Sequence, residues 1–108
     1  MEQRTDPVRE AQTETERRLL AALCQNVLGS RARAEVMRCF RNHRFAHPDH
    51  EVIYRALATI RIGEPADIRA MLAQAVTRLG FPDVDLDSLF DRPAPSPEKI
   101  AALLQELP

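Results

Sequence analysis

Residues 45–72, FAHPDHEVIYRALATIRIGEPADIRAML, contain two helix starts separated by a turn, and this stretch decides the fold. Pro48 suits the first turn of a helix because its missing N–H group needs no partner there. Gly63 and Pro65 predict a turn, and Asp67 predicts the N-cap of the following helix. Between these signals, apolar residues recur with helical spacing at Val52, Ile53, Ala56, Leu57 and Ile60. We therefore expect two amphipathic helices joined by a turn.

Helical patterns continue upstream of this stretch. Thr13 and Glu16 have the spacing of a capping box, which predicts the start of a first helix. Ser30 predicts the cap of a second helix that runs to about Phe40. The expected buried stripes are Leu19, Leu20, Leu23, Cys24 and Val27 on the first helix, and Ala32, Val36, Cys39 and Phe40 on the second. The segment that follows has no clear period and is predicted to be a loop, with Phe45 tucked into the core.

Downstream, three more helical segments are expected. A fourth helix, stopped by Gly80, has an apolar face of Ile68, Met71, Leu72, Ala75, Val76 and Leu79. A short amphipathic helix follows among the acids of residues 83–91. Ser96 and Pro97 then predict the start of a last helix, because they supply a cap and a proline at its first position.

These patterns predict an all-α fold, a compact bundle of about six short helices whose last two helices could form a hairpin. No segment shows the sustained alternation of a strand. At 108 residues the chain has room for one core. Residues 1–12 lack an apolar period and are predicted to be a disordered tail, whereas residues 13–108 form a single helical domain.

Composition bears on the compartment and on surface charge. Two cysteines without a secretory leader, and no apolar run long enough for a membrane span, favour a soluble cytoplasmic protein with reduced, buried thiols. Basic residues outnumber acids in residues 1–61, and acids outnumber basic residues beyond them. The basic side chains that could share one face are Arg31, Arg38, Arg41 and Arg44. That face suits nucleic acid or, alternatively, a solvated or partner-facing surface.

The sharpest candidate for chemistry is a zinc site formed by Cys39, His43, His47, Asp49 and His50. Pro48 argues against it, because a proline there prevents one helix from running through the set. We therefore expect His50 to pack or cap within its helix, with no metal and no cofactor. The chain also lacks a phosphate-binding loop and a serine in a nucleophile-elbow context, so no catalytic residue is assigned and the chain is predicted not to be an enzyme.

The positions at which this chain matches a known protein family follow one another in a fixed order along the sequence. Upstream they are Glu16, Leu19, Leu20, Ala21, Ala22, Leu23 and Asn26. The central signature is Phe45, Pro48, His50, Ile53, Gly63, Pro65 and Asp67, followed by Met71-Leu72, Leu79-Gly80 and a proline-rich connector. Over roughly residues 14–107, this succession resembles the N-terminal domain of replicative DNA helicases of the DnaB type. Ala46 departs from the pattern, because that family usually has a second aromatic residue there.

The resemblance implies a small all-α domain that performs no chemistry. It implies self-association and contact with primase, whose own C-terminal helicase-binding domain is similar in fold. By position, a C-terminal hairpin would cover about residues 84–107. The candidate interface is then Leu86, Leu89, Phe90, Ile100, Leu103, Leu104 and Leu107. The same residues could instead close the core of a monomer. The alternative function is that of a small nucleic-acid-binding or regulatory protein that uses the basic face of residues 31–44.

Overall fold

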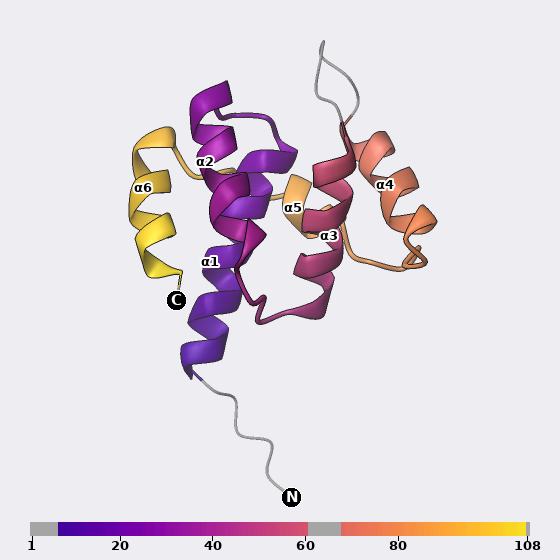
Figure 1. Ribbon diagram of the computed structural model, residues 1–108, viewed down its shortest axis with the longest axis horizontal. Helices are drawn as coiled ribbons and strands as arrows, with labels where there is room; N and C mark the ends of the chain where they lie inside the picture. Colours follow the sequence, from indigo (N-terminus) through magenta and orange to yellow (C-terminus); the bar gives the residue numbers. More distant parts are fainter. Residues whose placement is uncertain (1–6, 61–67, 108) are drawn as a thin grey trace, which may run out of the picture.

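The computed structural model describes residues 7–60 and 68–107, which contain six α-helices (Figure 1). Their bounds are α1 Pro7–Cys24, α2 Ser30–Arg41, α3 Pro48–Thr59, α4 Ile68–Arg78, α5 Asp87–Phe90 and α6 Pro97–Glu106. The all-α bundle expected from the sequence is thereby confirmed. The predicted turn at Gly63 and Pro65 and the predicted cap at Asp67 lie outside the described residues. In the described ranges, no helix is long and apolar enough to cross a membrane.

Helix α1 is the centre of the bundle. Helices α3, α5 and α6 all pack against it, while α2 contacts α3 and α6, and α4 lies beside α3 (Figure 1). The core residues that α1 contributes are fully or almost fully buried: Leu19, Leu20, Ala21, Ala22, Leu23 and Cys24. Because burying a leucine side chain contributes about 2 kcal/mol, this one helix supplies a large share of the hydrophobic stabilisation.

Helix α1 begins at Pro7, so the predicted start at Thr13 is wrong. Thr13 lies inside the helix, where its hydroxyl donates to the carbonyl oxygen of Arg9. The predicted disordered tail is also wrong for residues 7–12. These residues are ordered by polar contacts with the α2–α3 loop, in which Arg9 donates to the carbonyl of Ala46 and Gln12 to that of Arg44. Polar contacts leave no apolar period in the sequence.

The C-terminus of α1 is closed by Asn26, which has a positive φ of 53°. The Asn26 N–H donates to Leu23 and the Val27 N–H donates to Ala22, the two hydrogen bonds of a Schellman motif. Val27 is consequently 43% exposed and does not belong to the buried stripe predicted for it. Gly80 closes α4 with the same pair of bonds, which confirms the predicted stop.

The starts of the other helices follow the sequence signals with small differences. Pro48 occupies the first turn of α3 and Pro97 that of α6, as predicted. Gly29 rather than Ser30 is the N-cap of α2, and Ser30 is the first helical residue. At the other end of α4, Leu79 is 40% exposed, so its predicted burial is wrong.

The last two helices both pack on α1, α5 on one side and α6 on the other (Figure 1). Helix α5 has four residues. Of the candidate interface residues, Leu89, Ile100 and Leu103 are buried in the chain's own core, and four others, Leu86, Phe90, Leu104 and Leu107, are half-buried against it. The role proposed for these residues as a free dimer surface is therefore wrong for the three buried ones. They close the core of the monomer instead.

Candidate functional site

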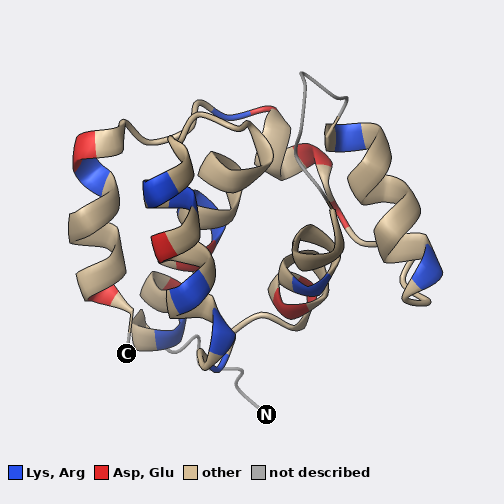
Figure 2. Ribbon diagram, turned by 45° about the horizontal axis from the view of Figure 1, so that its top comes forward, with Lys and Arg blue, Asp and Glu red and all other residues tan. Residues whose placement is uncertain are grey.

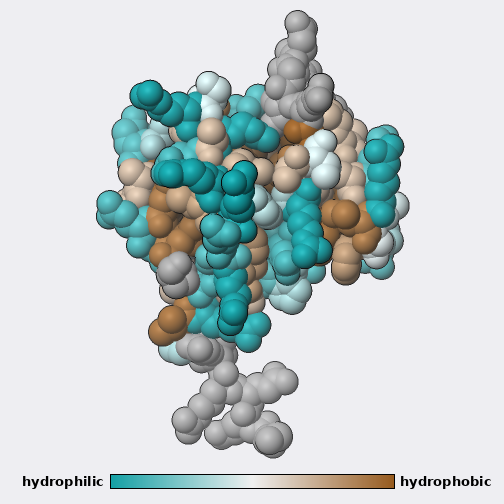
Figure 3. Space-filling view, in the orientation of Figure 1, coloured by the Kyte–Doolittle hydropathy of each residue, from teal (hydrophilic) through white to brown (hydrophobic). Residues whose placement is uncertain are grey.

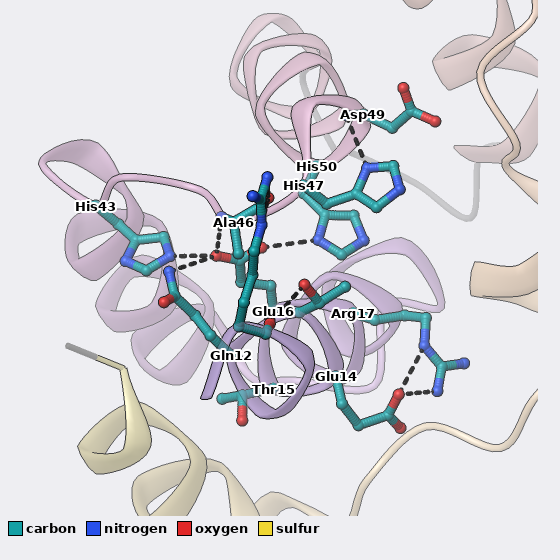
Figure 4. A network of polar contacts seen from close by, with 12 residues as sticks. Gln12, Glu14, Thr15, Glu16, Arg17, His43, Ala46, His47, Asp49 and His50 are labelled. Atoms are coloured by element: carbon teal, nitrogen blue, oxygen red, sulfur yellow. Dashed lines mark hydrogen bonds and ion pairs between the residues drawn. The ribbon is translucent and has the colours of Figure 1, made fainter. Parts of the chain in front are cut away.

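Glu16 on α1 is a fully buried glutamate whose carboxylate makes four hydrogen bonds (Figure 4). Its Oε2 atom lies 2.6 Å from Nε2 of His43 and 2.8 Å from the backbone nitrogen of Ala46. Its Oε1 atom lies 2.9 Å from Nδ1 of His50, and the Gln12 amide donates to Oε2 at 3.2 Å. We call these residues, Gln12, Glu16, His43, Ala46 and His50, the Glu16 network.

The charge state of Glu16 decides the direction of these hydrogen bonds. Burial alone would raise the pKa of Glu16, but hydrogen bonds from His50, the Ala46 N–H, His43 and Gln12 outweigh burial and lower the pKa to about 2. Glu16 is therefore ionised at neutral pH and accepts every bond. It follows that His50 carries a proton on Nδ1 and His43 carries one on Nε2.

Aromatic side chains enclose one side of this network. The ring of His43 lies 4.9 Å from that of Phe45 and 5.7 Å from that of Phe40, centroid to centroid. Tyr54 closes the same cluster against Phe45 at 5.8 Å. This packing confirms that Phe45 tucks into the core, and it keeps water from the histidine. Because the acceptor lies on α1 and its donors lie on α1, the α2–α3 loop and α3, the network joins these three segments.

The residues that were weighed as a zinc site do not form one cluster. His43 and His50 both face Glu16, whereas His47 accepts a hydrogen bond from the Asp49 N–H and so caps α3. Across residues 7–60 and 68–107, no three histidine, cysteine or acidic side chains are grouped so that they could hold a metal ion. His50 is buried within the bundle, in agreement with the packing role predicted for it. His47 supplies a helix cap that the sequence did not reveal.

The two cysteines differ in burial. Cys24 is fully buried, and burial raises the pKa of its thiol to about 12. This thiol stays protonated at neutral pH and is a poor nucleophile. Cys39 is only half-buried, so the prediction that both thiols are buried holds for Cys24 alone. Neither cysteine is paired in a disulfide.

All four arginines of the predicted basic face are exposed. Arg31, Arg38 and Arg41 recur with helical spacing along the outer side of α2, where Figure 2 shows repeated basic segments, and Arg44 follows in the loop. Glu35 lies beside them and pairs with Arg38 at 2.6 Å. The four arginines therefore form an exposed basic face, and Glu35 neutralises part of its charge.

Sequence reasoning missed the role of Glu16. The pattern Thr13-x-x-Glu16 indicated a capping box, which would place the glutamate at a solvated helix end. The available signal was a glutamate directly before the apolar run that starts at Leu19, together with a histidine in the apolar pattern of α3. Only the packing of α1 against α3 shows that these two residues meet.

Comparisons with known proteins add no relative. No family model matches this chain, and neither the curated proteins nor the solved structures contain a match. The resemblance to the helicase N-terminal domain therefore stays a prediction that depends on the residues themselves.

Proposed function

We propose that this chain is a non-catalytic protein–protein interaction domain of the type found at the N-terminus of DnaB-type replicative helicases. It would associate with itself and contact primase or another replication protein. One observation carries the proposal. Glu16 and His50 belong to two separate stretches that bear the resemblance, and they contact each other across the core at 2.9 Å. The matching positions thus lie in one packed unit.

Other matching positions support the same interpretation. Leu19, Leu20 and Leu23 from the first stretch and Ile53 from the second are buried together in the core. Pro48 starts α3 between these stretches. Since these residues specify the inside of the domain, the partner must contact other side chains on its surface.

The surface that best suits an apolar partner is a groove between the start of α1 and α6. It encloses about 710 Å³ and combines apolar and small side chains with polar ones: Pro7, Val8, Ala11, Thr15 and Leu103, and Gln12, Glu14, Arg18 and Glu106. Figure 3 shows hydrophobic surface on the side where Figure 1 places α6. A groove between two helices accommodates the apolar face of a third helix, from a second copy or from another protein. This groove replaces the leucine-rich hairpin as the proposed interface.

Association measured by sedimentation velocity tests the proposal. We expect the wild-type chain to form dimers as its concentration rises from about 5 to about 500 μM. Ala11→Glu places a charge in the groove and should weaken association at least about tenfold, because an unpaired charge is costly to bury. Ala73→Glu, at an exposed position on α4, is the matched control and should have no effect.

A second experiment measures, by isothermal titration calorimetry, the affinity of the chain for the helicase-binding domain of the primase from the same cell. Binding that Ala11→Glu weakens and Ala73→Glu leaves intact supports the proposal. A chain that stays monomeric over the whole concentration range, and that also fails to bind the primase domain, overturns it.

A further inference from the structure

A second concavity lies beside the apolar groove, between α1 and the segment that leads into α6, and the two share Glu14 and Arg18. It encloses about 430 Å³ and is lined by α1, Ser88 of α5, the connector of residues 92–96 and the first turn of α6. The charged residues of its lining are Arg17, Arg18, Arg92, Lys99 and Glu14. Four cations face one carboxylate, an excess of three positive charges. We call this feature the cationic cleft.

The single carboxylate is already engaged. Glu14 accepts from Nε of Arg17 at 3.1 Å and from Nε of Arg18 at 3.3 Å. These arginines therefore form a charged wall that is held in place by a shared counterion. Arg17 is fixed further by burial, since its side chain is only 17% exposed. Arg92 and Lys99 stand on the opposite wall and are exposed to solvent.

The uncharged lining limits the class of ligand. Pro93 and Pro95 lack backbone N–H groups, so the connector has more backbone acceptors than donors, and Ser88 and Ser96 add hydroxyl groups that both donate and accept. The lining contains no aromatic side chain among the described residues, so a nucleobase would find no stacking platform. A ligand that fits must bring anionic groups for the cations and N–H donors for the acceptors.

An extended acidic peptide supplies both kinds of group, because its backbone carries N–H donors and its side chains carry carboxylates. A DNA strand has phosphate acceptors but no backbone donors. We propose that the cationic cleft binds an acidic, extended segment of a partner protein. This inference rests on the proposed interaction function and gives the partner a chemistry: carboxylates that pair with Arg92 and Lys99, and an unpaired backbone edge.

Sequence reasoning could not have located the cleft. Arg17 and Arg18 lie more than seventy positions before Arg92 and Lys99. The amide of Gln25 contributes to their juxtaposition by donating to the carbonyls of Leu89 and Arg92, at 2.8 and 2.7 Å. These two bonds hold the end of α5 and the start of the connector against the end of α1.

The test is fluorescence anisotropy with two labelled probes of equal net charge. One is a peptide of alternating glutamate and glycine, and the other is an oligothymidylate. We expect the peptide to bind more tightly and its Kd to rise with salt between about 50 and 200 mM, because the contacts are exposed ion pairs. Equal or tighter binding of the oligothymidylate, or no binding of the peptide at low salt, overturns the proposal.

Variants locate the contact. Arg92→Gln combined with Lys99→Gln should raise the peptide's Kd at least about tenfold, which is about 1.4 kcal/mol. Arg31→Gln combined with Arg41→Gln removes the same charge from the exposed side of α2 and should change Kd less than about twofold. If the two double variants weaken binding equally, the peptide responds to net charge alone and the cleft assignment is wrong.

The failure of this proposal is distinguishable from the failure of the proposed function. Ala11 lines only the apolar groove, and Arg92 and Lys99 line only the cleft, although Glu14 and Arg18 line both. Ala11→Glu should therefore change the peptide's Kd much less than the double variant at Arg92 and Lys99 does. If the double variant at Arg92 and Lys99 binds the peptide as the wild type does while Ala11→Glu still reduces association, the cleft proposal fails and the interaction function stands. The opposite outcome is also possible: the chain does not associate with itself or bind the primase domain, but it binds the peptide, and the double variant loses that binding. That result supports the cleft proposal and rejects the proposed interaction with replication proteins.

Discussion

The Glu16 network and the cationic cleft contain adjacent residues of α1 in opposite environments, one buried and one open to solvent. Glu16 is fully buried, and four hydrogen bonds satisfy its carboxylate. Arg17 and Arg18, the next two residues, share one glutamate in a cleft with further unneutralised cations. The buried charge of Glu16 is thus matched by donors within the chain, whereas in the lining of the cleft four cations face one carboxylate.

The physical reason is the medium around each charge. A carboxylate inside the protein is costly unless donors surround it, and once they do, their attraction is weakly screened. Charges at the surface are screened by water and ions, so an unmatched cation costs the fold little. The network should therefore govern stability, and the cleft should govern binding.

The largest expected effect comes from Glu16→Gln. This change removes the charge that four donors solvate, and it places an amide donor against donors. We expect a loss of about 3–5 kcal/mol in the free energy of unfolding. Urea denaturation followed by circular dichroism measures it. Glu14→Gln, two residues away in the cleft, is the control and should cost less than about 1 kcal/mol. Equal losses at both positions would remove the distinction between the two regions.

Acid should weaken the same network without a mutation. The pKa of Glu16 is lowered from an ordinary 4.5 to about 2, so the network's stabilisation is fully present above about pH 4.5 and is lost as the pH falls towards 2. The linked free energy is about 3 kcal/mol. The measurement is the difference in unfolding free energy between the wild type and Glu16→Gln, which should shrink over this pH window. A difference that does not change with pH contradicts the assignment.

An intermediate effect is expected from the histidines that donate to Glu16. His50→Leu leaves one carboxylate oxygen without its donor and should cost about 1–3 kcal/mol. His50→Asn keeps an N–H donor near the position of Nδ1 and should lose less. In His50→Leu the acid transition should also begin at a higher pH, because the pKa of Glu16 rises when a donor is lost. If His50→Leu and His50→Asn are equally stable, the hydrogen bond is not the source of the stabilisation.

The smallest effect on stability is expected in the cleft. Arg92→Gln combined with Lys99→Gln removes two exposed cations and should change the free energy of unfolding by less than about 0.5 kcal/mol. The same double variant should lose peptide binding, so in the cleft a mutation affects the peptide's Kd without affecting the free energy of unfolding. A loss of stability comparable to that of His50→Leu would show that these side chains help to hold the connector in place.

The sequence predicted the fold well where the signal was local. Pro48 and Pro97 start helices, Gly80 ends one, and the apolar periods of α1 as far as Cys24 and of α3 as far as Leu57 are buried as expected. Predictions failed where polar contacts decided the outcome. Residues 7–12 are helical because Arg9 and Gln12 bind carbonyls more than thirty positions away, and such contacts leave no period in the sequence.

The candidate site was harder to predict than the fold. Sequence reasoning chose His43, His47 and His50 as the place for chemistry, and two of these histidines do meet a carboxylate. The carboxylate was assigned to a helix cap, so the histidines were weighed as zinc ligands, and once zinc was rejected they were left without a partner on α1. The basic face on α2 was predicted and is exposed, whereas the more concave cationic cleft was not recognised.

By itself, the sequence determined which segments are helical, where most of them start and stop, and which faces are apolar. These features depend on neighbours within one or two turns, because caps, proline geometry and periodicity are local. The tertiary structure alone decided that Glu16 meets His43 and His50, and that Arg17 and Arg18 share a cleft with Arg92 and Lys99. Those pairings depend on how α1 packs against the rest of the bundle, and residues far apart in the chain carry no local mark of the partner they will meet.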